Sequence, residues 1–135
     1  MIVGVGIDLV DIARVTKLLD AKGDRALHRL FTGDEVSYAL SRPLPALHFA
    51  ARLAAKEAAF KALAGNELAR GIGWKEIEVV RGEPRPTLAF HGRAADRSAE
   101  LGITTVWVTL THTATTAGAM VVLESRSPKS LQGSD

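Results

Sequence analysis

The chain has 135 residues and a mass of 14.4 kDa, the size of one globular domain. It contains no cysteine, which excludes disulfides, thiolate metal sites and a cysteine nucleophile. The formal net charge is only +2 and 5% of residues are aromatic, whereas nucleic-acid binders more often combine a basic stripe with stacking rings. No apolar run approaches the roughly 20 residues that span a bilayer, and no signal peptide is visible, so we expect a cytoplasmic protein without nucleic-acid or membrane partners.

The first predicted element is a strand over residues 2–10, where apolar and small residues alternate. One face carries Asp8 with Gly4 and Gly6, and these glycines leave room for a close approach on the side of the aspartate. Asp11 then stands where a helix cap is expected. A helix should follow it, because apolar residues recur at helical spacing from Ile12.

Two further helices are predicted before residue 65. The segment Thr32–Glu35 has the form of a capping box, which predicts a short helix up to about Leu40 and gives Glu35 a structural role. The second helix, residues 46–64, has a bulky apolar stripe and a separate face of alanines. A helix that is apolar on two sides is mostly buried.

The rest of the chain reads mainly as strands. Alternating or β-branched segments predict strands, and a short amphipathic segment predicts a helix between them. The strands are expected at 76–81, 87–90, 104–110 and 119–124, and the helix at 92–101. The order indicates an α+β fold, in which an antiparallel sheet packs with the long buried helix, with one domain over residues 1–124 and a disordered tail over 125–135.

The charges on the long helix suggest chemistry. Arg52 and Lys56 are like charges four residues apart, an unfavourable spacing unless an anion lies between them. Glu57 and Lys61 have the favourable i, i+4 spacing, and an ordinary solvent-facing ion pair explains them equally well. The functional alternative is a site for a metal-bound polyphosphate, with Asp8 as the second carboxylate, because Mg²⁺ prefers one or two carboxylates. Taken alone, Asp8 reads better as a helix cap.

The remaining signals are weaker. His112 lies in a predicted Thr-rich turn, where a hydrogen-bonded structural histidine is the usual case. No nucleophile elbow or phosphate-binding loop is present. Two rival functions stay open at this point. One is a different Mg²⁺-dependent phosphotransferase that acts on a nucleotide, and the other is a non-catalytic anion-binding or nucleic-acid-binding module.

Three segments together resemble one family. GVGIDLVDIARV at residues 4–15, ARLAAKEAAFKAL at 51–63 and WVTLTHTATTAGAMVVLE at 107–124 are similar, in order and spacing, to motifs of the holo-acyl-carrier-protein synthases. The similarity covers residues 1–124. The resemblance implies the 4'-phosphopantetheinyl transferase fold and a Mg²⁺-dependent transfer of phosphopantetheine from coenzyme A to a serine of an acyl carrier protein, or of a carrier domain, in fatty acid biosynthesis. It also implies a homotrimer with active sites at subunit interfaces.

The resemblance further implies roles for single residues. Asp8 and Glu57 match the magnesium ligands, and Lys61 matches a lysine at the coenzyme A pyrophosphate. Arg14 matches an arginine that meets the carrier protein. The remaining matches are basic or hydroxyl residues at the nucleotide site, namely Arg52, Lys56, Thr111 and His112.

The sequence departs from the family at a few positions. Thr109 and Thr111 stand where serines precede the matching histidine, so the hydroxyls are kept but carry added methyl groups. Leu53 replaces a common aromatic residue, a change that concerns packing. Two acceptors for the serine proton remain open, namely Glu57 and a water molecule on the metal.

Overall fold

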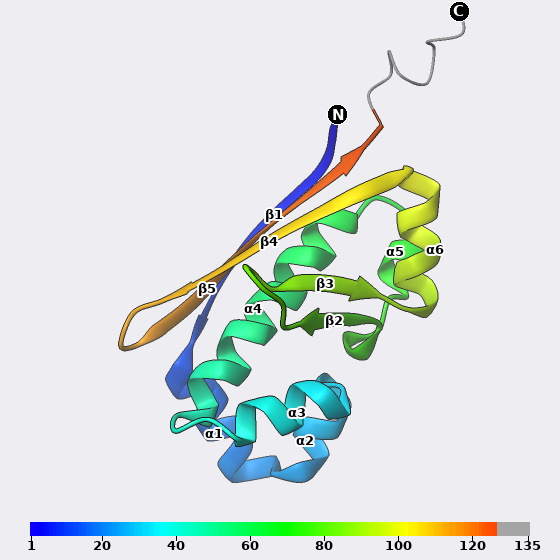
Figure 1. Ribbon diagram of the computed structural model, residues 1–135. Helices are drawn as coiled ribbons and strands as arrows, with labels where there is room; N and C mark the ends of the chain where they lie inside the picture. Colours follow the sequence, from blue (N-terminus) through cyan, green and yellow to red (C-terminus); the bar gives the residue numbers. More distant parts are fainter. Residues whose placement is uncertain (127–135) are drawn as a thin grey trace, which may run out of the picture.

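The structure is a computed structural model, and it describes residues 1–126. Its elements, shown in Figure 1, confirm the predicted α+β fold. They are β1 (Ile2–Asp11), α1 (Ile12–Lys22), α2 (Asp24–Leu30), α3 (Gly33–Leu40), α4 (Pro45–Leu63), α5 (Glu67–Arg70), a 3₁₀ turn (Trp74–Glu76), β2 (Ile77–Val80), β3 (Thr87–Phe90), α6 (Gly92–Leu101), β4 (Ile103–His112) and β5 (Thr116–Ser125).

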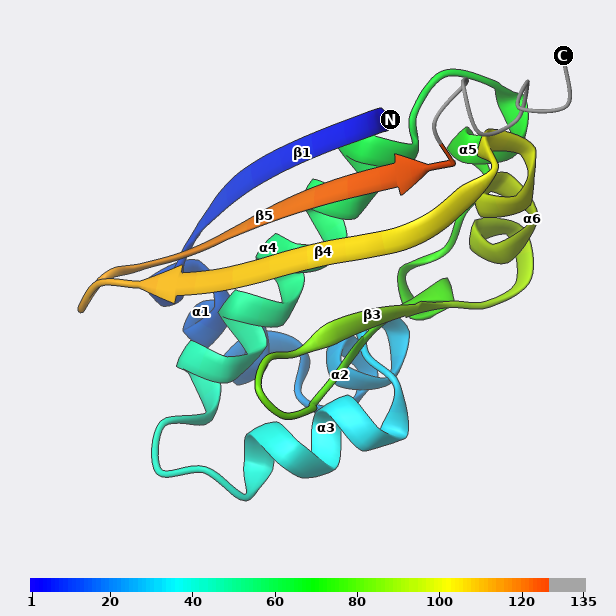
Figure 2. The ribbon, with the colours of Figure 1, turned by 45° about the horizontal axis from the view of Figure 1, so that its top comes forward.

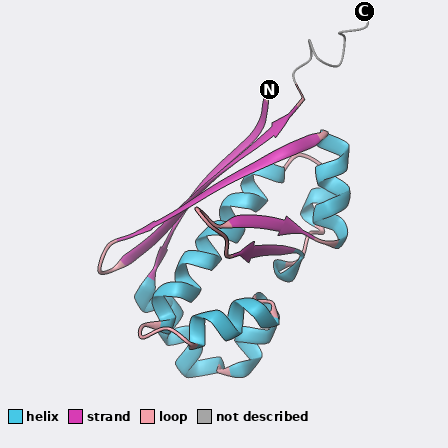
Figure 3. Ribbon diagram, viewed as in Figure 1, coloured by secondary structure: helices cyan, strands magenta, loops and turns pink. Residues whose placement is uncertain are grey.

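The strands form two antiparallel sheets. The larger sheet has the order β1-β5-β4, so the last strand lies between the first and the fourth, and β2 pairs only with β3. Figure 2 shows β5 between its two neighbours, and Figure 3 shows the helices gathered on one side of this sheet. The opposite, outer face of the sheet has no covering element in the described part of the chain.

Helix α4 is the centre of the fold. It packs against β1 and β5, and most of its residues are buried, as its two apolar faces predict. Its alanines allow the close contact, and so do the glycines of β1. A Cβ atom on Gly6 would lie 1.8 Å from the carbonyl oxygen of Ala58, and one on Gly4 would lie 2.2 Å from that of Ala62. The glycines on the face of Asp8 therefore admit the backbone of α4.

Both ends of α4 are held in place. Pro45 occupies the first turn, where its missing N–H costs no hydrogen bond. At the other end, Arg97 of α6 is buried and donates from Nε to the carbonyl oxygen of Leu63 at 2.7 Å and from Nη2 to that of Ala64 at 3.1 Å. These bonds satisfy carbonyl groups that a helix end leaves without partners. The helix is thereby a rigid support for the side chains it carries.

The outer face of the large sheet is apolar along β1. Val5, Ile7 and Leu9 are 55%, 61% and 68% exposed, and Trp107 and Met120 extend the surface onto β4 and β5. We call these five residues the outer apolar face. Exposed apolar area of this extent on neighbouring strands is typical of a surface that binds another protein chain.

Several predicted details were wrong or incomplete. Helices α2 and α5 were not predicted, because seven and four residues are too few for a clear helical period. Asp11 is at the N-cap position of α1 but its side chain makes no capping hydrogen bond. His112 ends β4 and does not lie in the turn. Strand β5 runs through Ser125, and residues 127–135 of the expected tail lie outside the described residues.

Candidate active site

The first group of predicted site residues lies where β1 crosses α4. Nζ of Lys61 is 3.0 Å from Oδ1 of Asp8 and donates to the carbonyl oxygen of Ile7 at 2.9 Å. Lys61 therefore pairs with Asp8, and not with Glu57 as its helical spacing predicted. The sheet places Asp8 on the face that meets α4, so residues 53 positions apart in the chain share one site.

Glu57 completes this group as a second carboxylate beside Asp8. Burial, a hydrogen bond with Asp8 and the negative charge of Asp8 together raise the pKa of Glu57 to about 7. Burial would also raise the pKa of Asp8, but hydrogen bonds from Glu57 and Lys61 and the charge of Lys61 lower it. Asp8 is the ionised member of the pair, and Glu57 loses its proton only at the cost of repulsion.

This pair fits a divalent cation. Oδ2 of Asp8 is buried and, with Glu57 ionised, has no donor among residues 1–126. No cluster of three or more metal-ligating side chains occurs in that same part of the chain. Two carboxylates are nevertheless the protein share that Mg²⁺ commonly takes, since its remaining positions are filled by water and substrate phosphates. The donor set suits a metal that arrives with a phosphorylated substrate.

Arg14 lies at the edge of this group. Its Nη2 is 3.7 Å from Oε1 of Glu57, while its side chain is 62% exposed. It lines a cavity of about 680 Å³, together with Lys17, Leu53 and Thr115. The lining of the cavity is mixed, with apolar side chains, the basic Arg14 and Lys17, and the acidic Asp11.

Lys56 does not belong to the site, which corrects its expected role at the nucleotide. Its side chain is completely buried, its Nζ lies 2.8 Å from Oε1 of Glu35, and it also donates to the carbonyl oxygens of Trp74, at 2.9 Å, and Ile77. All three donors of the ammonium group are used. The anion that relieves the like-charge spacing of Arg52 and Lys56 is thus a protein side chain, Glu35, which interacts favourably with both.

A second group lies on the other side of α4. Arg52, Thr111 and His112, all predicted at the nucleotide site, line a cavity of about 270 Å³. Five positions separate Arg52 from Glu57, which turns them about 140° apart around the helix. Leu110 aligns across β5 with Ala119 and Asp8, so Asp8 and His112 lie at opposite edges of the sheet. One copy of the chain therefore carries two separate groups of predicted site residues, which we call the two half-sites.

Among the polar and charged lining residues of the smaller cavity, three were not predicted. Tyr38, His48 and Arg81 face it from α3, α4 and the end of β2. His48 precedes Arg52 by one helical turn, so helical spacing could have revealed it. Burial and the charges of Arg52, Arg42 and His112 lower the pKa of His48. Tyr38 and Arg81 offered no such signal, because only the tertiary structure brings their segments together.

Comparison with known proteins gives the same family over the whole described fold. Residues 4–117 match the model of the 4'-phosphopantetheinyl transferase superfamily. The chain is 44% identical over 131 residues to the holo-[acyl-carrier-protein] synthase of Anaeromyxobacter sp. (strain K), covering 95% of this chain and 100% of the relative.

Solved structures agree. The acyl carrier protein synthase of Mycobacterium tuberculosis is 38% identical, with a TM-score of 0.71 over 93% of this chain and 99% of the other. The holo-(acyl-carrier-protein) synthase of Bacillus anthracis in complex with CoA (3',5'-ADP) is 30% identical, with a TM-score of 0.74 over 93% and 98%. The chain belongs to the 4'-phosphopantetheinyl transferase superfamily, and within it to the holo-acyl-carrier-protein synthases.

Proposed function

We propose that this chain transfers the 4'-phosphopantetheine group of coenzyme A to a serine of an apo acyl carrier protein, or of a carrier domain, in fatty acid biosynthesis. The serine hydroxyl attacks the β-phosphate, and 3',5'-ADP leaves. The observation that carries the proposal is the Asp8–Glu57 pair beside Lys61, in a chain of this family. The same pair speaks against a non-catalytic anion binder, because carboxylates repel phosphates unless a cation intervenes.

In this proposal Asp8 and Glu57 hold Mg²⁺. The bound ion supplies positive charge to the pyrophosphate oxygens, which reduces their repulsion of the nucleophile and stabilises the leaving group. Lys61 adds a fixed charge at the same place. Its bonds to Asp8 and to the carbonyl oxygen of Ile7 orient the ammonium group and leave one of its three donors for a phosphate oxygen.

In this proposal the second half-site binds the nucleotide end of coenzyme A. Arg52 and His112 line its cavity, and Thr111 stands at the boundary with the outer face. A Cβ atom on Gly118 would meet Leu9 at 2.9 Å and Thr111 at 3.5 Å, which places the Thr111 side chain on that face. Because the two half-sites lie on opposite sides of α4, one substrate contacts both when a neighbouring copy supplies the second.

A homotrimer provides this arrangement, and the outer apolar face supports it. Ile7 and Leu9 flank Asp8 in β1 with their side chains on the opposite face of the sheet, so a copy that covers them packs against the strand that carries Asp8. Burial of apolar area is the main driving force for such association. The wide spacing of the half-sites within one chain is then a consequence of building each active site between subunits.

The carrier protein is proposed to approach along α1. Arg14 lies there 3.7 Å from Glu57 and lines a cavity together with Lys17 and Leu53. Basic side chains at the mouth of the cavity suit a partner with acidic residues near its reactive serine. An apolar wall suits the pantetheine arm.

The direct test is the intact mass of an apo acyl carrier protein after incubation with this chain, coenzyme A and Mg²⁺. We expect the gain of one phosphopantetheine group, abolished by EDTA and restored by excess Mg²⁺. Turnover of coenzyme A without any carrier would favour a different phosphotransferase. Absence of transfer to every carrier tested, together with no binding of coenzyme A, would overturn the proposal.

A further inference from the structure

Arg52 is a buried cation that forms no ion pair of its own within the described chain, because Glu35, which attracts it, is paired with Lys56. It is only 4% exposed, and no carboxylate of residues 1–126 lies within ion-pair distance of it. Its Nη1 donates to the carbonyl oxygen of His48 at 3.3 Å, while its Nε is buried with no hydrogen-bond partner in the same residues. Burial of a charge that no counter-ion neutralises is unfavourable. Something on the wall of the cavity must compensate it.

The ring of Tyr38 provides part of this compensation. The guanidinium carbon of Arg52 lies 4.5 Å from the centroid of the ring, within cation–π distance. Tyr38 comes from α3 and Arg52 from α4, so the contact also fixes the guanidinium relative to two helices. A cation–π contact compensates only part of the cost of burying a charge. A bound anion would compensate the rest of this cost.

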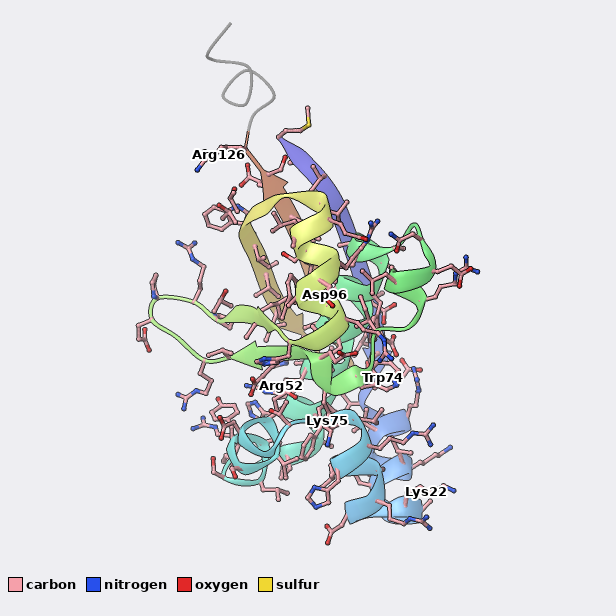
Figure 4. The ribbon with its side chains drawn as sticks, turned by 90° about the vertical axis from the view of Figure 1, so that its right-hand side faces the viewer. Lys22, Arg52, Trp74, Lys75, Asp96 and Arg126 are labelled. Carbon is pink, nitrogen blue, oxygen red and sulfur yellow. The ribbon has the colours of Figure 1, made fainter. Side chains whose placement is uncertain are left out.

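Arg81 approaches the same ring from the β2–β3 hairpin. Its guanidinium carbon lies 4.3 Å from the centroid, and it lines the same cavity as Arg52. Figure 4 shows Arg52 between the hairpin and α3. The other polar side chains on the cavity wall are Thr111 and the rings of His48 and His112, and no described carboxylate lines it. Arg42 lies over the same ring at 5.8 Å but does not line the cavity. The two guanidinium groups that do line it, with no described carboxylate on the wall, form a site for an anion.

We propose that Tyr38 is a positioning residue that holds Arg52 for the anionic nucleotide end of coenzyme A, and that Arg81 is an additional contact for the same group. This inference rests on the proposed function. It assigns two residues that the motifs of the chain did not identify. Tyr38 acts through the guanidinium groups of Arg52 and Arg81 that lie on its ring, and Arg81 also contacts a phosphate oxygen.

The role of Tyr38 is tested by ring removal. Tyr38→Leu should raise the Kd for coenzyme A, measured by calorimetry, about 10-fold, and raise KM similarly while kcat changes by less than about 2-fold. Tyr38→Phe keeps the ring and should restore most of the lost affinity. In an Arg52→Leu/Arg81→Leu background the same Tyr38→Leu change should have no further effect, because its action passes through these two guanidinium groups. Additive losses, or a failure of Phe to restore binding, would overturn the positioning role.

The role of Arg81 has a matched control in the same hairpin. Arg85 lies over the ring of Trp107, 5.2 Å from its centroid, and does not line the cavity. Arg81→Leu and Arg85→Leu remove the same charge from the same hairpin. We expect the Kd for coenzyme A to rise about 10-fold for Arg81→Leu and less than about 2-fold for Arg85→Leu, and the salt dependence of binding to weaken only for Arg81→Leu. Equal effects of the two substitutions would mean that Arg81 contributes only its net charge and makes no specific contact with coenzyme A.

These outcomes are separate from the proposed function itself. If the unmodified chain transfers phosphopantetheine and both Tyr38→Leu and Arg81→Leu bind coenzyme A normally, only this inference fails. If the unmodified chain neither binds coenzyme A nor modifies a carrier, the proposed function fails first. Thermal midpoints measured alongside identify a variant that has lost its fold, and in that case the Tyr38→Phe and Arg85→Leu proteins still decide the two roles.

Discussion

The ammonium group of Lys56 lies 2.8 Å from the carboxylate of Glu35, and neither side chain has any exposed surface. Glu35 also accepts from the backbone N–H groups of Thr32, at 2.9 Å, and Val79, at 2.8 Å. The pair therefore connects the start of α3, the middle of α4 and strand β2. A lysine that belongs to the AAKEA motif, four residues after Arg52, therefore stabilises the scaffold.

Removal of either partner should destabilise the protein strongly. We expect Lys56→Met and Glu35→Gln each to lower the free energy of unfolding, the lysine change by about 3–5 kcal/mol, because Lys56→Met leaves a buried carboxylate unpaired. The double variant Lys56→Met/Glu35→Gln should lose less than the sum of the two. Denaturant unfolding provides the measurement, and the Kd for coenzyme A of the remaining folded protein should stay unchanged. A loss of coenzyme A affinity in a folded Lys56→Met protein would show that Lys56 acts at the nucleotide site after all.

Replacement of Glu57 by glutamine should abolish transfer activity and raise the thermal stability of the chain at pH 8. A carboxyl group whose pKa is raised to about 7 in the folded chain, from an ordinary value of 4.5, opposes folding as the pH rises above 4.5, and the full penalty applies above pH 7. Glu57→Gln removes this penalty. We expect its thermal midpoint to exceed that of the unmodified chain at pH 8 and to match it near pH 4, while transfer to the carrier is lost.

Mg²⁺ should reverse the order of the thermal midpoints of the unmodified chain and Glu57→Gln at pH 8. The ion neutralises the repulsion between Asp8 and Glu57, so it should raise the thermal midpoint of the unmodified chain at pH 8 and have little effect on Glu57→Gln or Asp8→Asn. Ca²⁺, which tolerates looser oxygen sites, and K⁺ as a monovalent control separate specific binding from ionic strength. Equal stabilisation of all three proteins by Mg²⁺ would contradict the assignment of Asp8 and Glu57 as metal ligands.

A methyl group at Gly6 should be incompatible with the contact of β1 and α4. Its Cβ atom would lie 1.8 Å from the carbonyl oxygen of Ala58, and neither backbone can move without separating the sheet from the helix. We expect Gly6→Ala to lower the free energy of unfolding by about 3 kcal/mol or more. Gly33→Ala is the matched control, because a Cβ atom there meets no atom within 4 Å. A loss below about 1 kcal/mol for Gly6→Ala would contradict this contact.

Charge reversal at Arg14 should act on the carrier protein. Arg14→Glu removes the basic group beside the proposed path of the carrier and should raise the KM for the apo carrier about 10-fold, with the Kd for coenzyme A unchanged. Arg70→Glu is the charge-matched control, since Arg70 is exposed on α5 and pairs with Glu67. A raised Kd for coenzyme A in Arg14→Glu would place this arginine at the nucleotide.

A lysine on the outer apolar face should separate the subunits. Ile7→Lys introduces a charge into the proposed interface, and we expect a monomer by light scattering, with transfer activity lost because the half-sites no longer meet. Val80→Lys, at an exposed apolar position outside that face, should leave the oligomer intact. A trimer that persists in Ile7→Lys would contradict the role of this face.

The sequence by itself determined the family, the α+β order and most of the elements. Strand β3 and helix α6 agree with the predicted bounds, because alternation and helical spacing are local properties of a segment. The glycines beside Asp8 predicted a close approach on their face, and α4 fills that space. The capping box at Thr32 and Glu35 is present as predicted, since its bonds join residues three apart.

Only the tertiary structure decided how the charges are used. Lys56 and Lys61 have the same residue type on the same helix, yet one is buried against Glu35 and the other reaches Asp8. No local pattern separates them, because their partners lie 21 and 53 positions away in the chain. The same holds for Tyr38 and Arg81, which meet Arg52 only after three segments pack. Electrostatic energy depends on distance and burial, and both are set by the packing of segments that the sequence keeps far apart.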